Sequence, residues 1–356
     1  MERARRALEN AREHGADALI VQSAPNRRYL TGFTGSEGTI VITSEGVHLL
    51  VDFRYVEQAK LQAPGAHVQM YRREELWAKV AEALAAAGAR RPGFEAEHVS
   101  WARWRKMVES LPEGVEAVPV TGAVERVRAV KDAGELELIR RAMRITDEAL
   151  AAVLPEVRPG VRERELALRL EWEMKRRGAE GTAFDFIVAS GPRSAMPHGV
   201  AGDRALERGD FVTFDIGARY QGYCADMTRT VILGEADERQ RAIYDLVLRA
   251  QEAALAAVRA GVRASEVDAA ARRVIADAGY GEAFGHGLGH GVGLDVHEAP
   301  SLNARSEDVL EEGMVVTIEP GVYLEGWGGV RIEDSVVVTA AGYELLTFTA
   351  KDLMIL

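Results

Sequence analysis

The sequence is poor in features that mark secreted, membrane-spanning or nucleic-acid-binding proteins. Its single cysteine, Cys224, excludes an internal disulfide and is compatible with a reducing compartment. No apolar run reaches the roughly 18 residues needed to cross a bilayer, and the N-terminal segment MERARRALENAREHG is too charged for a signal sequence. The formal net charge of −11 argues against a nucleic-acid partner, because duplex affinity rests on Lys and Arg. We therefore predict a cytoplasmic protein that binds neither membrane nor nucleic acid.

Several catalytic signatures are also missing. The sequence contains no HExxH motif, no phosphate-binding P-loop, no GxSxG motif and no cysteine pair for structural zinc. A catalytic serine is not needed to explain any feature of the sequence. Any catalytic centre is therefore expected among carboxylates and imidazoles.

The first 122 residues are predicted to form a small mixed α/β domain. A helix-like start with Ala4, Leu8 and Ala11 on one face is followed by the strand-like segments ADALIV, TIVIT and VHLLV. Two helical segments come next, RYVEQAKLQ and ELWAKVAEALAAAG. Near residue 122 the pattern of short alternating helical and strand-like segments gives way to long amphipathic helices. We take this change as the domain boundary.

Residues 123–356 are predicted to form the larger domain, of the α+β class. An amphipathic helix carries Leu136, Ile139, Met143 and Leu150 on one face and ends before Pro155. A second helix stops at Gly178, and two later helices separate two strand-rich blocks. This order indicates helices that cover one side of a curved sheet.

The two strand-rich blocks resemble each other. GDFVTFDIG at 209–217 aligns with GMVVTIEPG at 313–321, so that Asp215 corresponds to Glu319. Each block then turns back and carries a second acid, Asp226 in the first block and Glu333 in the second.

The spacing of these acids indicates two close carboxylate pairs. A tight hairpin about Tyr220 and Gln221 would place Asp215 opposite Asp226, and a turn about Gly326 would do the same for Glu319 and Glu333. Like charges at this separation are destabilising unless a proton or a cation lies between them. The two pairs therefore predict one shared cationic centre.

Histidines concentrate near the same blocks. His286, His290 and His297 lie within the single stretch FGHGLGHGVGLDVHE, whose glycines leave room for close approach, and His198 precedes the first block. Carboxylates and imidazole without thiolate suit two divalent ions such as Mn²⁺, Co²⁺ or Zn²⁺. Two such ions can share a hydroxide and polarise a carbonyl or phosphoryl oxygen, which makes hydrolysis the leading reaction class.

At this point the sequence resembles a known family, the pita-bread metallopeptidases that include Xaa-Pro dipeptidase, aminopeptidase P and methionine aminopeptidase. The resemblance rests on FDIG, ADMTRT, GHGLGHGVGLDVHE, TIEPG and GVRIED, which occur in the family's order. It implies a C-terminal pita-bread domain, with a curved antiparallel sheet and two-fold pseudosymmetry, after a creatinase-like N-terminal domain. The internal repeat would then be that pseudosymmetry.

The resemblance also implies a set of metal ligands. Asp215 would chelate one metal ion, Asp226 and Glu333 would bridge the two ions, and His290 with Glu319 would complete the second.

On the substrate side, the resemblance implies roles for three further histidines and an arginine. His198 and His297 would lie beside the scissile carbonyl or leaving nitrogen, and His286 would shape the proline pocket. Arg331 would pair with carboxylates in the site. In the expected mechanism a hydroxide that bridges the metal ions attacks the carbonyl before proline, and Glu319 passes the water proton to the proline nitrogen.

The N-terminal segments NRRYLTGFTGSEG and VDFRYVEQA resemble the creatinase-like domain, which favours the Xaa-Pro branch over methionine aminopeptidase. The expected substrate is a proline-containing peptide, and the resemblance implies a homodimer. Whether dipeptides alone or longer peptides are cleaved is left open.

Two other readings compete with this one. A catalytically silent pita-bread module would bind peptides or protein partners and would usually have lost several ligands. A two-metal phosphoesterase would suit the ligand types but not the motifs.

Overall fold

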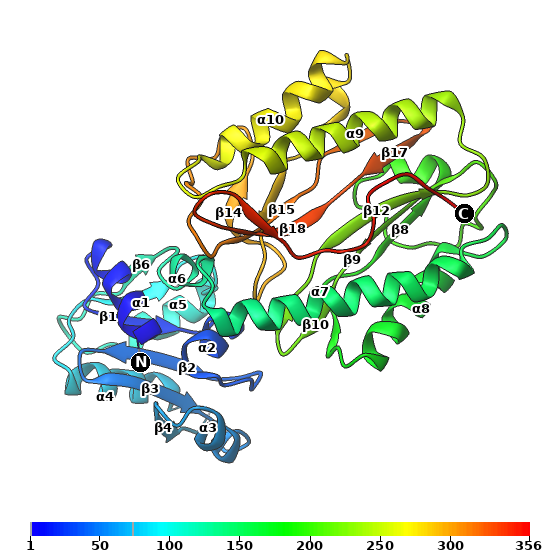
Figure 1. Ribbon diagram of the computed structural model, residues 1–356. Helices are drawn as coiled ribbons and strands as arrows, with labels where there is room; N and C mark the ends of the chain where they lie inside the picture. Colours follow the sequence, from blue (N-terminus) through cyan, green and yellow to red (C-terminus); the bar gives the residue numbers. More distant parts are fainter. Residues whose placement is uncertain (1, 73–74) are drawn as a thin grey trace. The chain divides into compact units, whose positions relative to one another are not determined.

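Short apolar segments in the first part of the chain pair into one mixed β-sheet (Figure 1). The computed structural model describes residues 2–72 and 75–356. The sheet has the order β4-β3-β2-β1-β5-β6 and consists of β1 Ala18–Val21, β2 Thr39–Thr43, β3 Gly46–Val51, β4 His67–Met70, β5 Pro92–Glu95 and β6 Val118–Val120. Neighbours among β1, β2 and β3 are antiparallel, whereas β4, β5 and β6 are added in parallel.

Helices connect these strands. They are α1 Glu2–Glu13, α2 Ala24–Thr31, α3 Val56–Gln62, α4 Leu76–Ala86, α5 Trp101–Ser110 and α6 Glu125–Ala129. Ala4, Leu8 and Ala11 of α1 are buried, as the spacing predicts. The sequence pattern did not indicate α2, α5 or the last three strands, because these strands are short and interrupted by polar residues or proline.

By its internal contacts the chain divides into the units Met1–Arg128 and Ala129–Leu356. The predicted boundary near residue 122 lies shortly before this division. Among the described residues, no helix is both long and apolar enough to cross a membrane.

The second unit opens with a helical pair. α7 Ala133–Val153 starts at a capping box between Asp132 and Glu135, and it ends where Pro155 enters a short 3₁₀ turn. α8 Glu163–Arg176 packs beside it. Both helices bury their apolar faces against the first group of strands.

That first group contains two small sheets. One has the order β20-β12-β9-β8, with β8 Ile187–Ser190, β9 Phe211–Ile216, β12 Met227–Ile232 and β20 Met354–Ile355. The other joins β7 Gly181–Thr182, β10 Ala218–Tyr220 and β11 Tyr223–Cys224. Pairing is antiparallel throughout, except that β20 runs parallel to β12.

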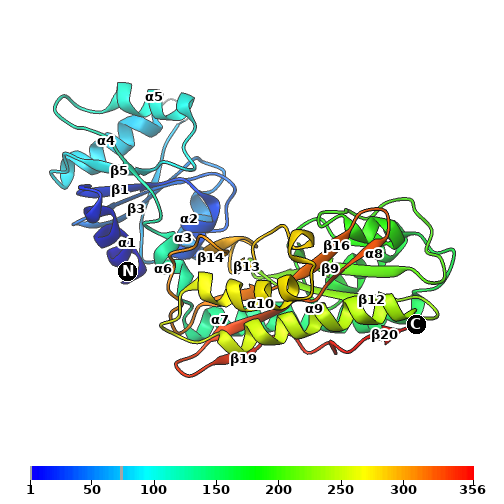
Figure 2. The same cartoon turned by 90° about the horizontal axis from the view of Figure 1, so that it is seen from above.

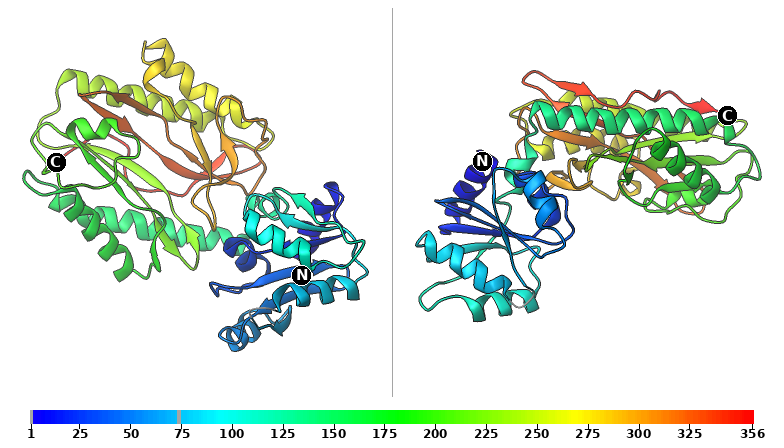
Figure 3. Two further views of the ribbon diagram at one scale, coloured as in Figure 1. Left: turned by 180° about the vertical axis from the view of Figure 1, so that it is seen from behind. Right: turned by 90° about the horizontal axis from the view of Figure 1, so that it is seen from below.

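The second group repeats this plan. A sheet of order β14-β13-β15-β18-β19 consists of β13 Gly289–Gly291, β14 Glu298–Leu302, β15 Val315–Ile318, β18 Asp334–Val338 and β19 Tyr343–Leu345. The hairpin of β16 Gly321–Leu324 and β17 Gly328–Arg331 extends from it. Helices α9 Glu238–Ala257 and α10 Ala264–Asp277 cover this half, and the strands run between the two helical pairs (Figures 1 and 3).

The register of the first hairpin corrects one prediction. Asp215 stands opposite Thr228, not opposite Asp226, because the turn is formed by Gln221 and Gly222. Both turn residues have positive φ, 44° and 80°, which is the geometry of a two-residue turn that matches strand twist. Asp226 therefore lies diagonally from Asp215, two residue pairs further toward the turn.

The second hairpin has the predicted register. The pairs Ile318 with Asp334 and Gly321 with Arg331 follow one register, in which Glu319 stands opposite Glu333. The two halves of this unit meet where β17 and β18 pass β12. There the backbone N–H of Glu333 donates to Thr228 O at 3.1 Å, and Thr230 Oγ1 donates to Arg331 O at 2.9 Å. Figure 2 shows the second unit turned by 90°, with β9, β12 and β16 and the helices α7 to α10 labelled.

Candidate functional site

One cavity of about 770 Å³ in the second unit is lined by every site residue named from the sequence. These residues are His198, Asp215, Asp226, His286, His290, His297, Glu319, Arg331 and Glu333. They come from both strand groups and from the loops between them, so folding gathers residues that are far apart in the sequence. The volume is in the range of small-molecule sites.

The acids and one imidazole form the floor of this cavity. Ligand atoms of Asp226, His290 and Glu333 all lie within 4.8 Å of one another. His290 Nε2 is 3.3 Å from Glu319 Oε1 and 3.6 Å from Asp226 Oδ2. Asp226 and Glu333 are almost fully buried, at 4% and 1% exposure, so water can screen their charges only weakly.

Burial and mutual repulsion govern the electrostatics of the floor. Burial, together with the nearby carboxylates, raises the pKa of Asp226 and of Glu333 well above the ordinary range. Burial also raises the pKa of Asp215, although Arg331 opposes that shift. Burial would do the same to Glu319, but the adjacent His290 outweighs it and lowers the pKa of Glu319. A cation among these groups would relieve the repulsion.

Two atoms of this floor are left without a partner by the protein. Asp215 Oδ1 and Glu333 Oε1 are buried and accept no hydrogen bond from the described residues. Buried carboxylate oxygens are normally satisfied, so an additional positively charged partner is expected here. Four carboxylates with one imidazole suit divalent ions that accept oxygen and nitrogen ligands. The residues present therefore fit a divalent metal centre.

The position of His290 depends on its flanking glycines. A Cβ atom at Gly289 would overlap the carbonyl oxygen of Thr317, and one at Gly291 would overlap that of Ala299. β13 can therefore lie tightly between β14 and β15 only with glycine at both positions. His290 Nδ1 lies 3.1 Å from Gly291 O, and a proton donated there leaves Nε2 free to face the acids.

Arg331 is buried and holds one of the acids in place. Its Nη2 donates to Asp215 Oδ2 at 2.6 Å, and its Nε donates to Thr228 Oγ1 at 3.1 Å. Thr228 Oγ1 in turn donates to Glu333 Oε2 at 2.7 Å. Thr228 was not identified from the sequence, although it follows Asp226 by two residues and so lies on the same face of the strand.

Tyr323 is a second residue that sequence reasoning missed. Arg331 Nη1 donates to its hydroxyl at 2.9 Å, and the same hydroxyl is 2.9 Å from His286 Nε2. Burial lowers the pKa of His286, which favours the neutral ring beside this hydroxyl. No motif or spacing marks Tyr323, because its role arises only when the hairpin folds back onto His286.

The remaining histidines lie on the wall of the cavity. The rings of His297 and His290 are in edge contact, with centroids 4.3 Å apart. Burial and the neighbouring His290 lower the pKa of His297. His198 lies in the loop between the 3₁₀ turn Gly191–Ala195 and β9, and it lines the same cavity. The wall thus offers imidazole groups next to the acid floor.

Comparison with known families assigns both units. The pattern of Metallopeptidase family M24 matches residues 137–340, and that of the Creatinase/Prolidase N-terminal domain matches residues 3–130.

Individual relatives match along almost the whole chain. An Xaa-Pro dipeptidase of Pyrococcus horikoshii is 39% identical and covers 99% of both chains. The structure of an Xaa-Pro dipeptidase from Bacillus anthracis superposes with a TM-score of 0.97 at 42% identity, covering 100% of this chain and 99% of the other. The structure of an X-Pro aminopeptidase from Thermotoga maritima gives a TM-score of 0.89 at 38% identity, covering 98% and 100%.

Proposed function

Since the chain belongs to metallopeptidase family M24, we propose that it hydrolyses the peptide bond that precedes proline, in Xaa-Pro dipeptides or at the N-terminus of longer peptides. The observation that carries this proposal is the single cavity, in which a buried cluster of acids and His290 adjoins three further histidines and Arg331. The relatives named above include both an Xaa-Pro dipeptidase and an X-Pro aminopeptidase, at similar identity. Sequence identity therefore supports cleavage of the bond before proline more strongly than it supports either dipeptides or longer peptides as the substrate.

We assign the metal ligands to five residues of the floor: Asp215, Asp226, His290, Glu319 and Glu333. The unpartnered oxygens of Asp215 and Glu333 support this assignment, as does the repulsion around Asp226. Two divalent ions, Mn²⁺, Co²⁺ or Zn²⁺, match these ligands. When bound, they lower the pKa of the attacking water and polarise the scissile carbonyl.

The protein's own groups supply the remaining chemistry. Glu319 accepts the proton of the attacking water and returns it to the proline nitrogen. His198 or His297 donates a hydrogen bond to the oxyanion that develops on the carbonyl. His286, fixed by Tyr323, shapes the proline pocket, and Arg331 holds Asp215 in its orientation.

Three accompanying features are part of the proposal. We propose a homodimer that works in the cytoplasm, and its one buried cysteine, Cys224, suits that compartment. We also retain a creatinase-like domain over residues 1–122 and a catalytic domain over 123–356.

A panel of short peptides tests the proposed activity. Purified full-length protein, incubated with Mn²⁺, Co²⁺ or Zn²⁺ in turn, should release proline from Leu-Pro and should leave Leu-Ala intact, as followed by chromatography of the products. Cleavage of Leu-Pro-Gly as well would indicate the aminopeptidase type, and cleavage of Leu-Pro alone the dipeptidase type.

Other results on this panel would contradict the proposal. Release of methionine from Met-Ala-Ser without cleavage of either proline peptide would indicate a methionine aminopeptidase. Hydrolysis of p-nitrophenyl phosphate alone would indicate a phosphoesterase. A protein that binds metal but cleaves none of these compounds would be a binding module.

The close packing around His290 gives a second test. Replacing Gly289 with alanine should reduce the rate of Leu-Pro hydrolysis about a hundredfold, because the added methyl group pushes β13 away from Thr317 and moves His290 out of place. Gly285→Ala is the matched control, since a Cβ there meets nothing within 4 Å. Equal rates for Gly289→Ala and the wild type, at equal metal content, would show that the position of His290 is not critical.

A further inference from the structure

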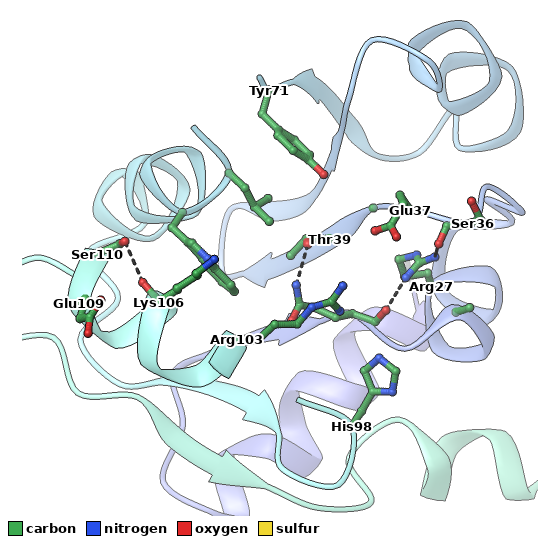
Figure 4. Close-up of a pocket in the computed structure, with 15 residues that line it drawn as sticks. Arg27, Ser36, Glu37, Thr39, Tyr71, His98, Arg103, Lys106, Glu109 and Ser110 are labelled. Atoms are coloured by element: carbon green, nitrogen blue, oxygen red, sulfur yellow. Dashed lines mark hydrogen bonds between the residues drawn. The ribbon is translucent and has the colours of Figure 1, made fainter. Parts of the chain in front are cut away.

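The first unit contains a cavity of about 680 Å³ that shares no residue with the acid cluster (Figure 4). It lies among α2, β2, α4 and α5, and its residues include Arg27, Thr39, Trp77, Arg103 and Lys106. Its volume would accommodate a small organic molecule. The proposed hydrolysis gives this cavity no role.

The wall of this cavity holds a buried cation that no carboxylate contacts directly. Arg27 is only 4% exposed, and its guanidinium donates to the carbonyl oxygens of Gln22, Gly35 at 3.0 Å and Ser36 at 3.1 Å. All these acceptors are neutral, and no carboxylate of the described residues lies within ion-pair distance of Arg27, although Glu37 and Glu95 attract it from farther away. An unpaired buried charge is costly, yet arginine remains protonated in proteins. An anion is therefore the partner that this group lacks.

A second guanidinium faces the same space. Arg103 of α5 projects toward the region of Arg27 in Figure 4. Burial lowers the pKa of Arg27, and repulsion by Arg103 adds to this shift, while Glu37 and Glu95 oppose it. Within the part of the chain that is described, the Arg103 side chain has neither an ion pair nor a hydrogen bond. Two like charges that face one cavity favour an oppositely charged group between them. Two cations thus face this cavity, whereas acids form the floor of the cavity in the second unit.

The remaining charges do not cancel this excess. Lys106 also lines the cavity. Of the two acids in the wall, Glu109 is engaged by Arg105 at 3.3 Å, which leaves Glu37 as the acid that offsets the three cations. A positively charged cavity stands out in a chain whose net charge is −11.

The other side of the cavity is apolar. Leu76, Trp77 and Tyr71 are partly buried against the hydrophobic core of this unit, and each lines the cavity. An indole and a phenol ring offer flat surfaces on which a planar group can stack. The cavity therefore combines a cationic end with an aromatic wall.

We propose that this cavity binds a small organic anion whose carboxylate or phosphate lies between Arg27 and Arg103 and whose planar body packs against Trp77. Guanidinium groups recognise either oxyanion by paired hydrogen bonds, so both head groups share this chemistry. The site belongs to the first unit alone and does not depend on the peptidase assignment.

Titration calorimetry of the full-length protein with phenyl phosphate and with phenylacetate tests the site. At least one of them should bind with one equivalent per chain, and the tighter of the two identifies the head group. The neutral analogue 2-phenylethanol should bind much more weakly. Arg103→Gln should weaken binding of the anion about tenfold, because one charge-assisted hydrogen bond is lost.

Arg103 is the residue of choice because it is exposed and its replacement should leave the fold intact, whereas Arg27 also holds three carbonyl groups. Arg6→Gln is the matched control, since it removes the same charge from an exposed position of α1 that does not line the cavity, and it should bind like the wild type. Failure of both anions to bind would overturn the proposal. Equal affinity of the Arg103→Gln variant and the wild type would overturn it too.

Discussion

Asp226→Ala should lower the rate of Leu-Pro hydrolysis by roughly a thousandfold or more, while the protein stays folded. Asp226 lies at the centre of the acid cluster, and its carboxylate is within reach of both His290 and Glu333. Because we propose that Asp226 holds two cations, it should contribute to every reaction step in which they act. Its loss should therefore remove several kcal/mol of transition-state stabilisation. Metal content should also fall, which can be measured by mass spectrometry of the purified variant.

The fold should survive this change because the removed group is an unfavourable one in the metal-free protein. Asp226 is buried beside acids that raise its pKa, so its loss relieves repulsion. In the presence of chelator the variant should therefore melt no lower than the wild type, and its circular dichroism should be unchanged. The control is Asp277→Ala, an exposed acid at the end of α10, which should retain wild-type activity and metal content. Full activity and metal content in Asp226→Ala would refute the assignment of this residue.

The first hairpin shows what the sequence could and could not determine. Its register was predicted wrongly, because the turn is formed by Gln221 and Gly222 and not by the preceding pair. Moving the turn by one residue changes each cross-strand partner by two positions, and a shift of two keeps every side chain on the same face. Asp215 and Asp226 therefore still face the same cavity. The proximity of the acids was predictable from face alternation even though their pairing was not.

Other parts of the site depend on contacts that no single sequence reveals. Glu319 and Glu333 could be paired because Gly326 marks their turn and the hairpin has no irregularity. Tyr323 and Thr228 acquire their roles only through Arg331, which contacts Tyr323 within its own hairpin and reaches across to Thr228 in the first strand group. In the first unit, Arg27 lies within a segment that the sequence pattern did not identify as helical. Such residues are found from packing, since neither periodicity nor motif distinguishes them.

Removing the proposed metal ions should both abolish activity and destabilise the catalytic unit. After dialysis against chelator, Leu-Pro hydrolysis should be undetectable and should return on addition of Mn²⁺, Co²⁺ or Zn²⁺, with the most effective ion as the candidate for the native one. An ion present at a hundred times its dissociation constant stabilises the folded state by about 2.7 kcal/mol, which corresponds to a rise in melting temperature of roughly 5 to 10 °C for a domain of this size. Calorimetric scans with and without the ion measure this rise.

Combining the Asp226→Ala substitution with metal removal separates an effect of the metal from a general loss of structure. If the five floor residues hold the ions, the rise in melting temperature caused by metal should be much smaller in Asp226→Ala than in the wild type, whereas Asp277→Ala should show the full rise. The reason is that Asp226 and the ions stabilise the protein through the same contacts, so their effects cannot add. An undiminished rise in Asp226→Ala would mean that the stabilising ions bind elsewhere. The buried acids around Asp226 would then need another source of compensating charge, and the proposed reaction would lose its metal centre.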